Sequence, residues 1–425
     1  MKVVGLITEY NPFHTGHLFH IKEAKQLSHA DFVLVIMSGD FVQRGAPALL
    51  DKYMRTEMAL LCGADAVIEL PVRFSCASAE YFACGAVFLL HQLGIVDFLC
   101  FGSECGNLDF LQPIAQSLLK ESSDFQKKIS LFIKQGNSYP TARSKAFCEI
   151  FSKQFSTEIL SSLLSKPNNI LALEYLKALH QIQSPILPLT IKRQQAGYHD
   201  LKLSKNFASA TALRHHILCH NLTIIKPYIP EAAFSILERE FLRSFPIQTD
   251  DFSLPLYYKI RSHLEMGRSL TIYQDITSDL EARIFKKLHQ FTSFTSFALL
   301  LKTKQYTLTR IYRCLLHILL DIKAPSPSAL LTCMPSYARL LGFRKSSAAL
   351  LTAIKTHSSI PLITKTADAK QILLPTAKQP SFQSVNPFTL FQQDLFAADL
   401  YQKTQELKFH TTLTNEFSHP LVLIP

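Results

Sequence analysis

The chain has 425 residues, of which 48% are hydrophobic and 31 are Phe, so its composition is that of a folded globular protein with a sizeable core. Because a single core rarely grows past about 250–300 residues, two domains are expected. The formal net charge is +11; residues 221–425 carry 23 Lys and Arg against 15 Asp and Glu, and residues 1–220 carry 21 against 18. This uneven surplus predicts that an anionic macromolecule meets the second half, and a merely basic surface is the alternative.

Nine cysteines form no C-x-x-C pair, and most lie in apolar runs. This pattern predicts buried thiols in a reducing compartment rather than disulfides or a zinc site. The first residues have a strand pattern rather than that of a secretion signal, and no apolar run is long enough to span a bilayer. We therefore expect a soluble, cytoplasmic protein with no membrane contact, and the sequence predicts no stable protein partner.

The first predicted unit is a strand, a turn and a helix. Residues 2–7 form an apolar run typical of a strand, Asn11-Pro12 is a turn signal, and residues 16–29 have apolar side chains at helical spacing. His14 and His17 stand where the turn passes into the helix.

The same rhythm continues along the chain. We predict strands at residues 31–38, 66–70 and 96–101, and helices at residues 47–61 and 78–93. Strands that alternate with helices in this way predict an α/β fold with a parallel sheet and crossover helices. In such sheets ligands bind beyond the carboxyl ends of the strands. The polar and small residues expected to collect there are Thr8, Asp40, Glu69 and Gly102.

Residues 106–165 have a mainly helical pattern and are interpreted as an insertion. Asn168 and Asn169 then precede an amphipathic helix, so either could cap this helix or hold a ligand, and the sequence leaves the choice open. Residues 187–192 predict a fifth strand, which would deliver Arg193 to the same edge of the sheet.

A second group of candidate phosphate ligands follows. Ser209 and Thr211 stand at a predicted helix start, and Arg214 comes one turn later. Hydroxyl and backbone N–H groups can hold phosphate oxygens there, while the guanidinium supplies a planar cationic fork. An ordinary helix N-cap explains the hydroxyl residues equally well.

From residue 221 the alternation stops, and residues 227–242, 277–288 and 307–322 have helical periodicity, which predicts a helical second domain. One segment interleaves cations with an aromatic ring, as contacts to an RNA backbone and its bases require. A solvated helix face is the competing interpretation. The candidate RNA-contacting residues are Lys302, Lys304, Tyr306, Arg310 and Arg313.

The chemistry is expected at the first helix. A helix N-terminus offers unpaired N–H groups and the positive end of its dipole, so it favours a phosphate. His14 and His17 are three residues apart and would point to the same side of the first turn, while Gly16 leaves room for a flat ligand. The combination predicts a seat for a nucleoside triphosphate. His14, His17 and His20 as metal ligands are the alternative, but no nearby carboxylate completes a set, so no metal site is predicted.

These residues carry a family resemblance. His14-x-Gly16-His17 after a strand resembles the HxGH signature of the nucleotidyltransferase superfamily, and the segment that ends in Arg214 resembles its second signature, a loop that neutralises departing pyrophosphate. The longer strings EYNPFHTGH, SGDFVQRGAP, GADAVIELP, PNNILALEYLKAL and ASATALR resemble the bacterial tRNA(Met) cytidine acetate ligase family.

The resemblance implies a Rossmann-like nucleotidyltransferase domain in residues 1–220, with the insertion at about 106–165, and a mostly helical, basic tRNA-binding domain in residues 221–425. It implies activation of acetate with ATP, accompanied by Mg²⁺, to acetyl-adenylate, and transfer of the acetyl group to the wobble cytidine of elongator tRNA(Met). Two other hypotheses stay open: an adenylyltransferase that acts on a small cofactor precursor, and a non-catalytic RNA-binding protein.

Site residues are implied as follows. Catalysis would involve His14, His17 and Arg214, and Asp40 and Arg44 would join the RNA-contacting residues in binding the substrates. The ATP site would comprise Ile7, Thr8, Glu9, Tyr10, Asn11, Pro12, Phe13, His14, Thr15, Gly16, His17, Leu18, Phe19, His20, Gly102, Asn168, Arg193, Ser209 and Thr211.

Overall fold

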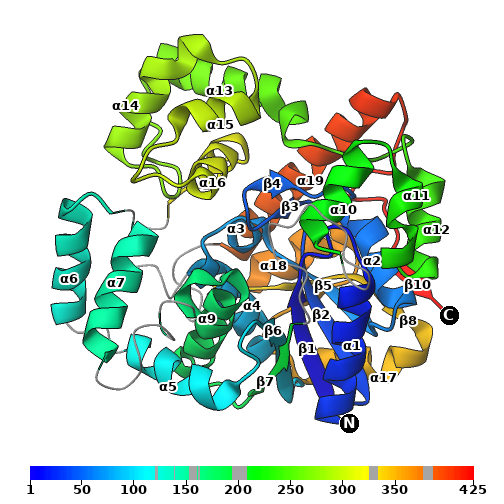
Figure 1. Ribbon diagram of the computed structural model, residues 1–425. Coiled ribbons are helices and arrows are strands. Elements are labelled where there is room, and N and C mark those ends of the chain that lie inside the picture. Colours follow the sequence, from blue (N-terminus) through cyan, green and yellow to red (C-terminus); the bar gives the residue numbers. More distant parts are fainter. Residues whose placement is uncertain are drawn as a thin grey trace.

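The computed structural model describes residues 1–119, 123–137, 139–152, 160, 163–193, 208–324, 334–376 and 386–425. Its centre is a sheet in the order β10-β8-β5-β2-β1-β6-β7, with β9 paired to β8 (Figure 1). Strands β5, β2, β1, β6 and β7 are mutually parallel, β8 runs antiparallel to β5, and β9 and β10 are parallel to β8. The strands are β1 (Val3–Thr8), β2 (Phe32–Ser38), β5 (Ala66–Leu70), β6 (Phe98–Ser103), β7 (Leu187–Lys192), β8 (Ala338–Arg344), β9 (Leu362–Ile363) and β10 (Val422–Ile424).

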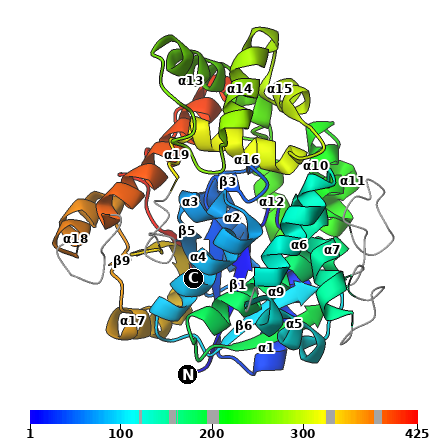
Figure 2. The ribbon, with the colours of Figure 1, turned by 90° about the vertical axis from the view of Figure 1, so that its left-hand side faces the viewer.

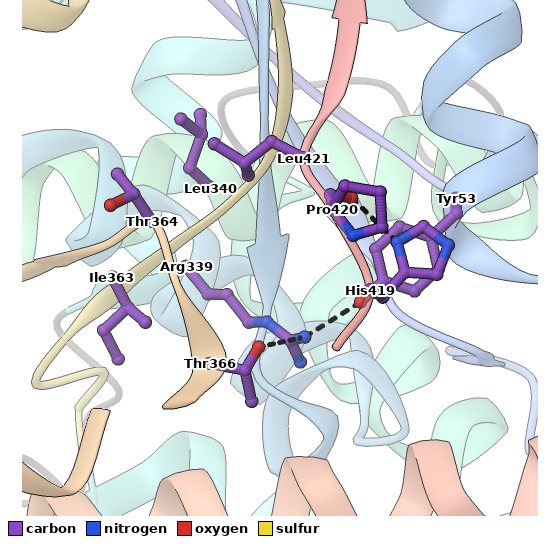
Figure 3. Close-up of a pocket in the computed structure, with 9 residues that line it drawn as sticks. All are labelled: Tyr53, Arg339, Leu340, Ile363, Thr364, Thr366, His419, Pro420 and Leu421. Carbon is purple, nitrogen blue, oxygen red and sulfur yellow. Dashed lines mark hydrogen bonds between the residues drawn. The ribbon is translucent and has the colours of Figure 1, made fainter. Parts of the chain in front are cut away.

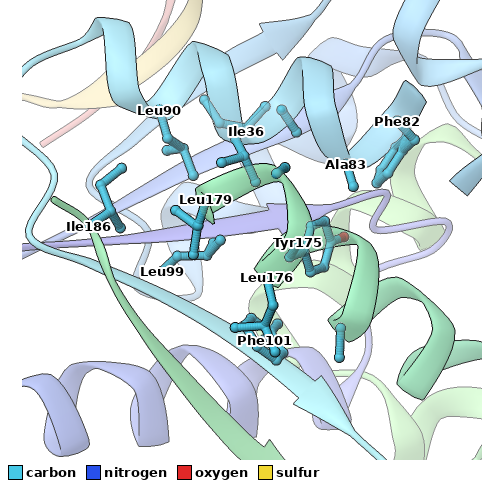
Figure 4. Packing of buried hydrophobic residues seen from close by; sticks show 14 of the residues in the cluster. Ile36, Phe82, Ala83, Leu90, Leu99, Phe101, Tyr175, Leu176, Leu179 and Ile186 are labelled. Atoms are coloured by element: carbon cyan, nitrogen blue, oxygen red, sulfur yellow. The ribbon is translucent and has the colours of Figure 1, made fainter. Parts of the chain in front are cut away.

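Helices cover both faces of the sheet because its central strands are apolar on both sides. Along β2, Leu34 and Ile36 face one hydrophobic cluster, whereas Val33 and Val35 face the other. The first cluster includes α4 (Ala79–Gln92), α9 (Pro167–Gln181) and α17 (Ala348–His357). Figure 4 shows part of it, with Leu90 of α4 and Leu179 of α9 packed near Leu99 of β6. The second includes α1 (Thr15–Ser28), α2 (Lys52–Leu61), α10 (Ala210–Leu218) and α12 (Glu231–Glu240).

The described parts of residues 106–165 are helical, as the sequence predicted. They form α5 (Leu108–Leu119), α6 (Ser123–Lys134) and α7 (Tyr139–Phe151), which lie outside α9 at one side of the molecule (Figure 2). The short helices α3 (Val72–Ser75) and α11 (Leu222–Ile225) connect larger elements. Near the end of the chain, α18 (Ala369–Thr376) leads towards the long helix α19 (Pro387–Phe409).

A helical cap stands above the carboxyl ends of the strands (Figure 1). It consists of α13 (Ser253–Glu265), α14 (Ser278–Lys287), α15 (Phe294–Leu301) and α16 (Leu308–Leu319), packed around their own hydrophobic cluster. That cluster also contains Phe41 from the hairpin of β3 (Phe41–Val42) and β4 (Ala46–Pro47), so the cap is anchored on this hairpin. Gly45, with φ of +78°, lies so close to α16 that a Cβ there would be 2.5 Å from the Arg313 nitrogen.

The α/β class and the five parallel strands were predicted, and two local differences stand out. The helix predicted at residues 47–61 begins only at Lys52, because residues 41–47 form the β3–β4 hairpin. Helical periodicity after residue 221 also missed β8, β9 and β10, which return to the sheet. The strands with which they pair are distant in sequence, as in the pairing of Val67 with Gly342, so no local sequence pattern predicts these three strands. The division into domains at residue 220 stays a prediction.

Candidate active site

The site lies where the sheet order reverses. From β1 the chain goes to β2 on one side, and β6 lies on the other, so the carboxyl ends of β1 and β6 flank a topological switch point. Open α/β sheets bind ligands in the crevice at such a point. The loop that follows β1 contains His14 and His17, Gly102 lies in β6, and Arg193 follows β7, so the fold brings these predicted residues to one place.

The two imidazoles cap α1. His14 is the N-cap residue, and its Nδ1 accepts the N–H of Gly16 at 3.0 Å. The His17 Nδ1 accepts the N–H of His14 at 3.3 Å, which completes a capping box made of two histidines. The rings are stacked with centroids 3.7 Å apart. An accepting imidazole nitrogen carries no hydrogen, so in the neutral rings the hydrogen is on Nε2, and each ring is a donor at Nε2.

Burial and neighbouring cations keep these histidines uncharged. Burial, followed by Arg193 and Arg214, lowers the pKa of His14 to about 3. Burial, then His14 and Arg193, places the pKa of His17 well below its ordinary value. Burial and Arg193 lower the pKa of His20 to about 4. Near neutral pH the site therefore offers neutral N–H donors beside fixed guanidinium charges.

The loop between β1 and α1 is held from several directions. Asn11 accepts the N–H of Leu49 through Oδ1 at 2.9 Å, and the Tyr10 ring packs edge to face on the His17 ring with centroids 4.9 Å apart. Phe13 is fully buried beside Tyr10. The remaining predicted residues of this segment are Ile7 and Thr8 at the end of β1, Glu9 and Pro12 in the loop, and Thr15, Leu18 and Phe19 in α1. The loop is thus held in place by contacts on several sides.

The segment that ends in Arg214 contacts the loop that carries the two histidines. Ser209 caps α10 by accepting the N–H of Ala212 at 3.0 Å. Arg214 donates from Nη1 to the Asn11 carbonyl at 2.9 Å and from Nη2 to Thr211 Oγ1 at 3.1 Å. The guanidinium and the hydroxyl group predicted as phosphate ligands therefore stand beside the loop that carries the histidines, although about 200 residues separate them.

Arg193 and Gly102 occupy the other wall. Arg193 continues the β6–β7 pairing, donating its N–H to the Ser103 carbonyl at 2.9 Å. A Cβ on Gly102 would be 3.2 Å from Cγ of Arg193, so the glycine lets the stem of the arginine lie over the strand. Residues 194–207, which follow Arg193, lie outside the described residues.

The two asparagines at the start of α9 differ in burial and in their hydrogen-bond partners. Asn169 is 3% exposed, and its Oδ1 accepts the N–H of Cys105 at 3.1 Å. Asn168 is half-buried, and its Nδ2 donates to Glu104 Oε1 at 2.7 Å. Asn169 is committed to the loop that follows β6, so Asn168 is the one accessible to a ligand.

Asp40 lies in a buried charge network rather than in an open crevice. Its Oδ1 accepts the N–H of Lys52 at 2.8 Å, and burial raises the pKa of Asp40 to about 7. The Lys52 Nζ is 3.0 Å from Glu69 Oε1 and 3.1 Å from Glu416 Oε2. Arg339 pairs with both glutamates. A role for Asp40 in substrate binding stays a prediction, and its observed contacts are with Lys52.

A small pocket adjoins this network (Figure 3). The Tyr53 and His419 rings stack at its rim, and Arg339 donates from its floor to Thr366 Oγ1 at 3.0 Å. Despite burial, which raises it, Lys52 and then Arg339 lower the pKa of Glu416 to about 2. The cations of this pocket are already neutralised by carboxylates, so it does not resemble a phosphate site.

The predicted RNA-contacting residues lie on the cap. Lys302 and Lys304 are exposed, and the Arg310 guanidinium stands 5.1 Å from the Tyr306 ring centroid. Arg313 is partly buried where α16 meets the β3–β4 hairpin, whose turn carries Arg44 next to Gly45. Arg44 of the hairpin and Arg313 of the cap therefore lie on either side of the contact between Gly45 and α16.

Sequence reasoning missed two residues that organise the site. Arg55 is fully buried and donates to the carbonyls of Glu9 at 2.7 Å and of Ser38 at 3.0 Å, and also to the Gly39 carbonyl, so it holds the ends of β1 and β2 together. Glu104 binds the first residues of α9 through both carboxylate oxygens. A charged residue within an otherwise apolar helix pattern was the only local signal for Arg55, and no local pattern pointed to the contact of Glu104 with α9.

Over the described ranges, no three His, Cys, Asp or Glu side chains are grouped so that they could hold a metal ion. In the same part of the chain, no helix combines the length and the apolar character needed to cross a bilayer.

Known proteins resemble this chain over its whole length. The family model described as HIGH Nucleotidyl Transferase matches residues 1–416. A tRNA(Met) cytidine acetate ligase of Thermoanaerobacter sp. (strain X514) is 38% identical over 423 residues, which cover 99% of this chain and 100% of the relative. The enzyme of the same name from Alkaliphilus metalliredigens (strain QYMF) is 41% identical, with 86% and 88% covered.

Two solved structures have the same fold over the whole chain. The crystal structure of Thermotoga maritima TmcAL bound with alpha-thio ATP is 30% identical, with a TM-score of 0.88 and 100% of both chains covered. The apo structure of that protein has a TM-score of 0.90. The chain therefore belongs to the HIGH nucleotidyl transferase family and, within it, to the tRNA(Met) cytidine acetate ligases.

Proposed function

We propose that this chain is an ATP-dependent ligase that activates acetate and transfers the acetyl group to the wobble cytidine of elongator tRNA(Met), forming N4-acetylcytidine. The observation that carries the proposal is the pair of neutral histidines at the N-terminus of α1, flanked by two arginines at the switch point of the sheet. The relatives are named for this reaction, and the solved neighbour is bound to an ATP analogue.

In the first step, an oxygen of acetate attacks the α-phosphorus of ATP, the bond to the bridging oxygen breaks, and pyrophosphate leaves. Such a displacement needs positioning and charge stabilisation more than a covalent nucleophile. The Nε2–H groups of His14 and His17 would donate to phosphate oxygens, and Arg193 and Arg214 would offset the charge that develops on pyrophosphate. Mg²⁺ would arrive with the triphosphate, bound mainly by phosphate oxygens and water.

In the second step, the exocyclic N4 of cytidine attacks the acetyl carbonyl, AMP leaves, and N4 loses a proton. The basic cap supports an RNA substrate, because Lys302 and Lys304 are exposed beside the Arg310 and Tyr306 pair. Arg44 lies in the β3–β4 turn next to Gly45, which contacts the backbone of α16 at Arg313, so it is placed near this cationic surface. A tRNA substrate would place the activity in the cytoplasm.

The test is exchange of labelled pyrophosphate into ATP, with and without acetate and tRNA. We expect exchange that depends on acetate and does not require tRNA. His17→Ala should reduce it at least about 100-fold, because the substitution removes both a donor to phosphate and part of the cap of α1. His29→Asn, at the opposite end of the same helix, is the control and should keep the rate.

Two other results would contradict the proposal. Exchange that is indifferent to acetate would favour an adenylyltransferase that acts on another small substrate. ATP binding without any exchange would favour an RNA-binding protein that has lost catalysis.

A further inference from the structure

We propose that Glu104 is a positioning residue that sets the base specificity of the nucleotide site. It holds Asn168 so that the side-chain carbonyl of this asparagine faces the exocyclic amine of adenine. The inference rests on the proposed function, because it assigns the part of that site which meets the base.

The geometry fixes which end of the Asn168 amide faces Glu104. Glu104 Oε1 accepts the backbone N–H of Asn168 at 3.2 Å and its Nδ2 at 2.7 Å, and Oε2 accepts the N–H of Asn169 at 2.7 Å. A carboxylate can only accept hydrogen bonds, so the NH₂ group must be the end that faces it. The carbonyl oxygen of Asn168 is therefore turned away from Glu104 and is available as an acceptor.

The negative charge of Glu104 disfavours a phosphate group at the N-terminus of α9. The Glu104 carboxylate already binds the first N–H groups of α9, so this N-terminus carries a compensating negative charge. In α1, by contrast, the first turn contains no acidic residue, and the positive charges of Arg193 and Arg214 act on His14, whose pKa is lowered first by burial and then by these two arginines. The triphosphate belongs at α1, and an uncharged part of the nucleotide belongs beside α9.

Adenine can donate a hydrogen bond to the side-chain carbonyl of Asn168. Its edge carries an amine at C6, which donates, whereas guanine carries an oxygen at C6, which would face the Asn168 carbonyl and repel it. Asn168 lies next to Glu104, just beyond the end of β6, the strand that contains Gly102. This arrangement would favour ATP over GTP by the orientation of a single amide.

The experiment measures equilibrium binding of ATP, GTP and 2′-deoxy-ATP by calorimetry without acetate. Asn168→Ala should weaken ATP binding about 10-fold, because one hydrogen bond is lost, and should not weaken GTP binding, because the repulsion from the asparagine carbonyl is removed. The control is Asn107→Ala in the same loop, where Asn107 Oδ1 accepts the N–H of Phe110 at 3.1 Å. It should leave the ratio of ATP to GTP affinity unchanged.

Glu104→Gln tests the positioning role. A glutamine amide can accept or donate, so Asn168 can turn and present its NH₂ group to the guanine oxygen. GTP binding should strengthen, and the ATP to GTP ratio should fall about 10-fold. A purely structural role of Glu104 would weaken both nucleotides equally and leave the ratio unchanged.

Unchanged ratios in both variants would overturn the inference. A loss of discrimination against 2′-deoxy-ATP in Asn168→Ala, with the base preference intact, would also overturn it and assign Asn168 to the ribose. If the wild type shows no acetate-dependent exchange, the proposed reaction fails, and the binding ratios still decide the role of Glu104 separately.

Discussion

The neutral state of His14 predicts a specific acid sensitivity of the ligand-free protein. His14 is 8% exposed, and its pKa is lowered from an ordinary value of 6.5 to about 3. Below pH 6.5 the unfolded chain binds a proton at this imidazole, whereas the folded protein does not until the pH falls towards 3. The contribution of His14 to folding stability is therefore fully present above pH 6.5 and is lost as the pH falls from 6.5 towards 3.

The magnitude follows from the two pKa values. Each pKa unit is worth about 1.36 kcal/mol, so between pH 7 and pH 5 the contribution of His14 falls by about 2 kcal/mol. His17 and His20 have pKa values lowered by burial too and act in the same direction. His14→Asn keeps an N-cap side chain that can accept the N–H of Gly16 but cannot titrate.

The assay is urea unfolding of the full chain at pH 7, 6 and 5 without nucleotide. We expect the wild type to lose about 2 kcal/mol more than His14→Asn between pH 7 and pH 5. His410→Asn is the matched control: His410 is an exposed cap of α19 in the left-handed conformation, which asparagine tolerates. Equal losses in the wild type and in His14→Asn would refute the assignment of a buried neutral imidazole, and with it the donor role of Nε2.

Three further predictions concern Arg214, the cationic surface of the cap and the contact of Gly45 with α16. Arg214→Lys should lower kcat/KM for acetate-dependent exchange at least about 10-fold, because lysine cannot replace the two directed bonds that hold the guanidinium beside the histidine loop; an unaltered rate would remove this residue from the mechanism. The double change Lys304→Glu and Arg310→Glu should weaken tRNA binding and reduce its salt dependence while sparing acetyl-adenylate formation, and unchanged tRNA affinity would exclude this surface. Gly45→Ala should cost about 2 kcal/mol more unfolding free energy than Gly267→Ala, since both glycines have positive φ but only the first meets the backbone of α16; equal costs in urea unfolding would contradict the close contact.

Much of the nucleotide site could be predicted because its determinants are local. A strand, a turn and a helix start lie within residues 3–17, and the helix start itself orients His14 and His17. Because ligands bind at the carboxyl ends of parallel strands, the sequence also predicts that Gly102 and Arg193 lie near the histidines.

Other parts of the site depended on contacts that have no local signature. Whether Asn168 or Asn169 is accessible was decided by Glu104 and Cys105, which are 64 or 65 residues away in sequence. Asp40 was expected at the open carboxyl edge of the sheet. In the structure it contacts Lys52, the first residue of α2, a helix that was predicted to begin at residue 47.

By itself, the sequence determined that β1 ends in a loop of two histidines at a helix start, because short-range hydrogen bonds and apolar periodicity act between neighbouring residues. Only the tertiary structure decided which groups stay charged and which face a ligand. Burial and the direction of a side chain depend on what distant segments pack against it, as Arg214 and Asn11 show across about 200 residues.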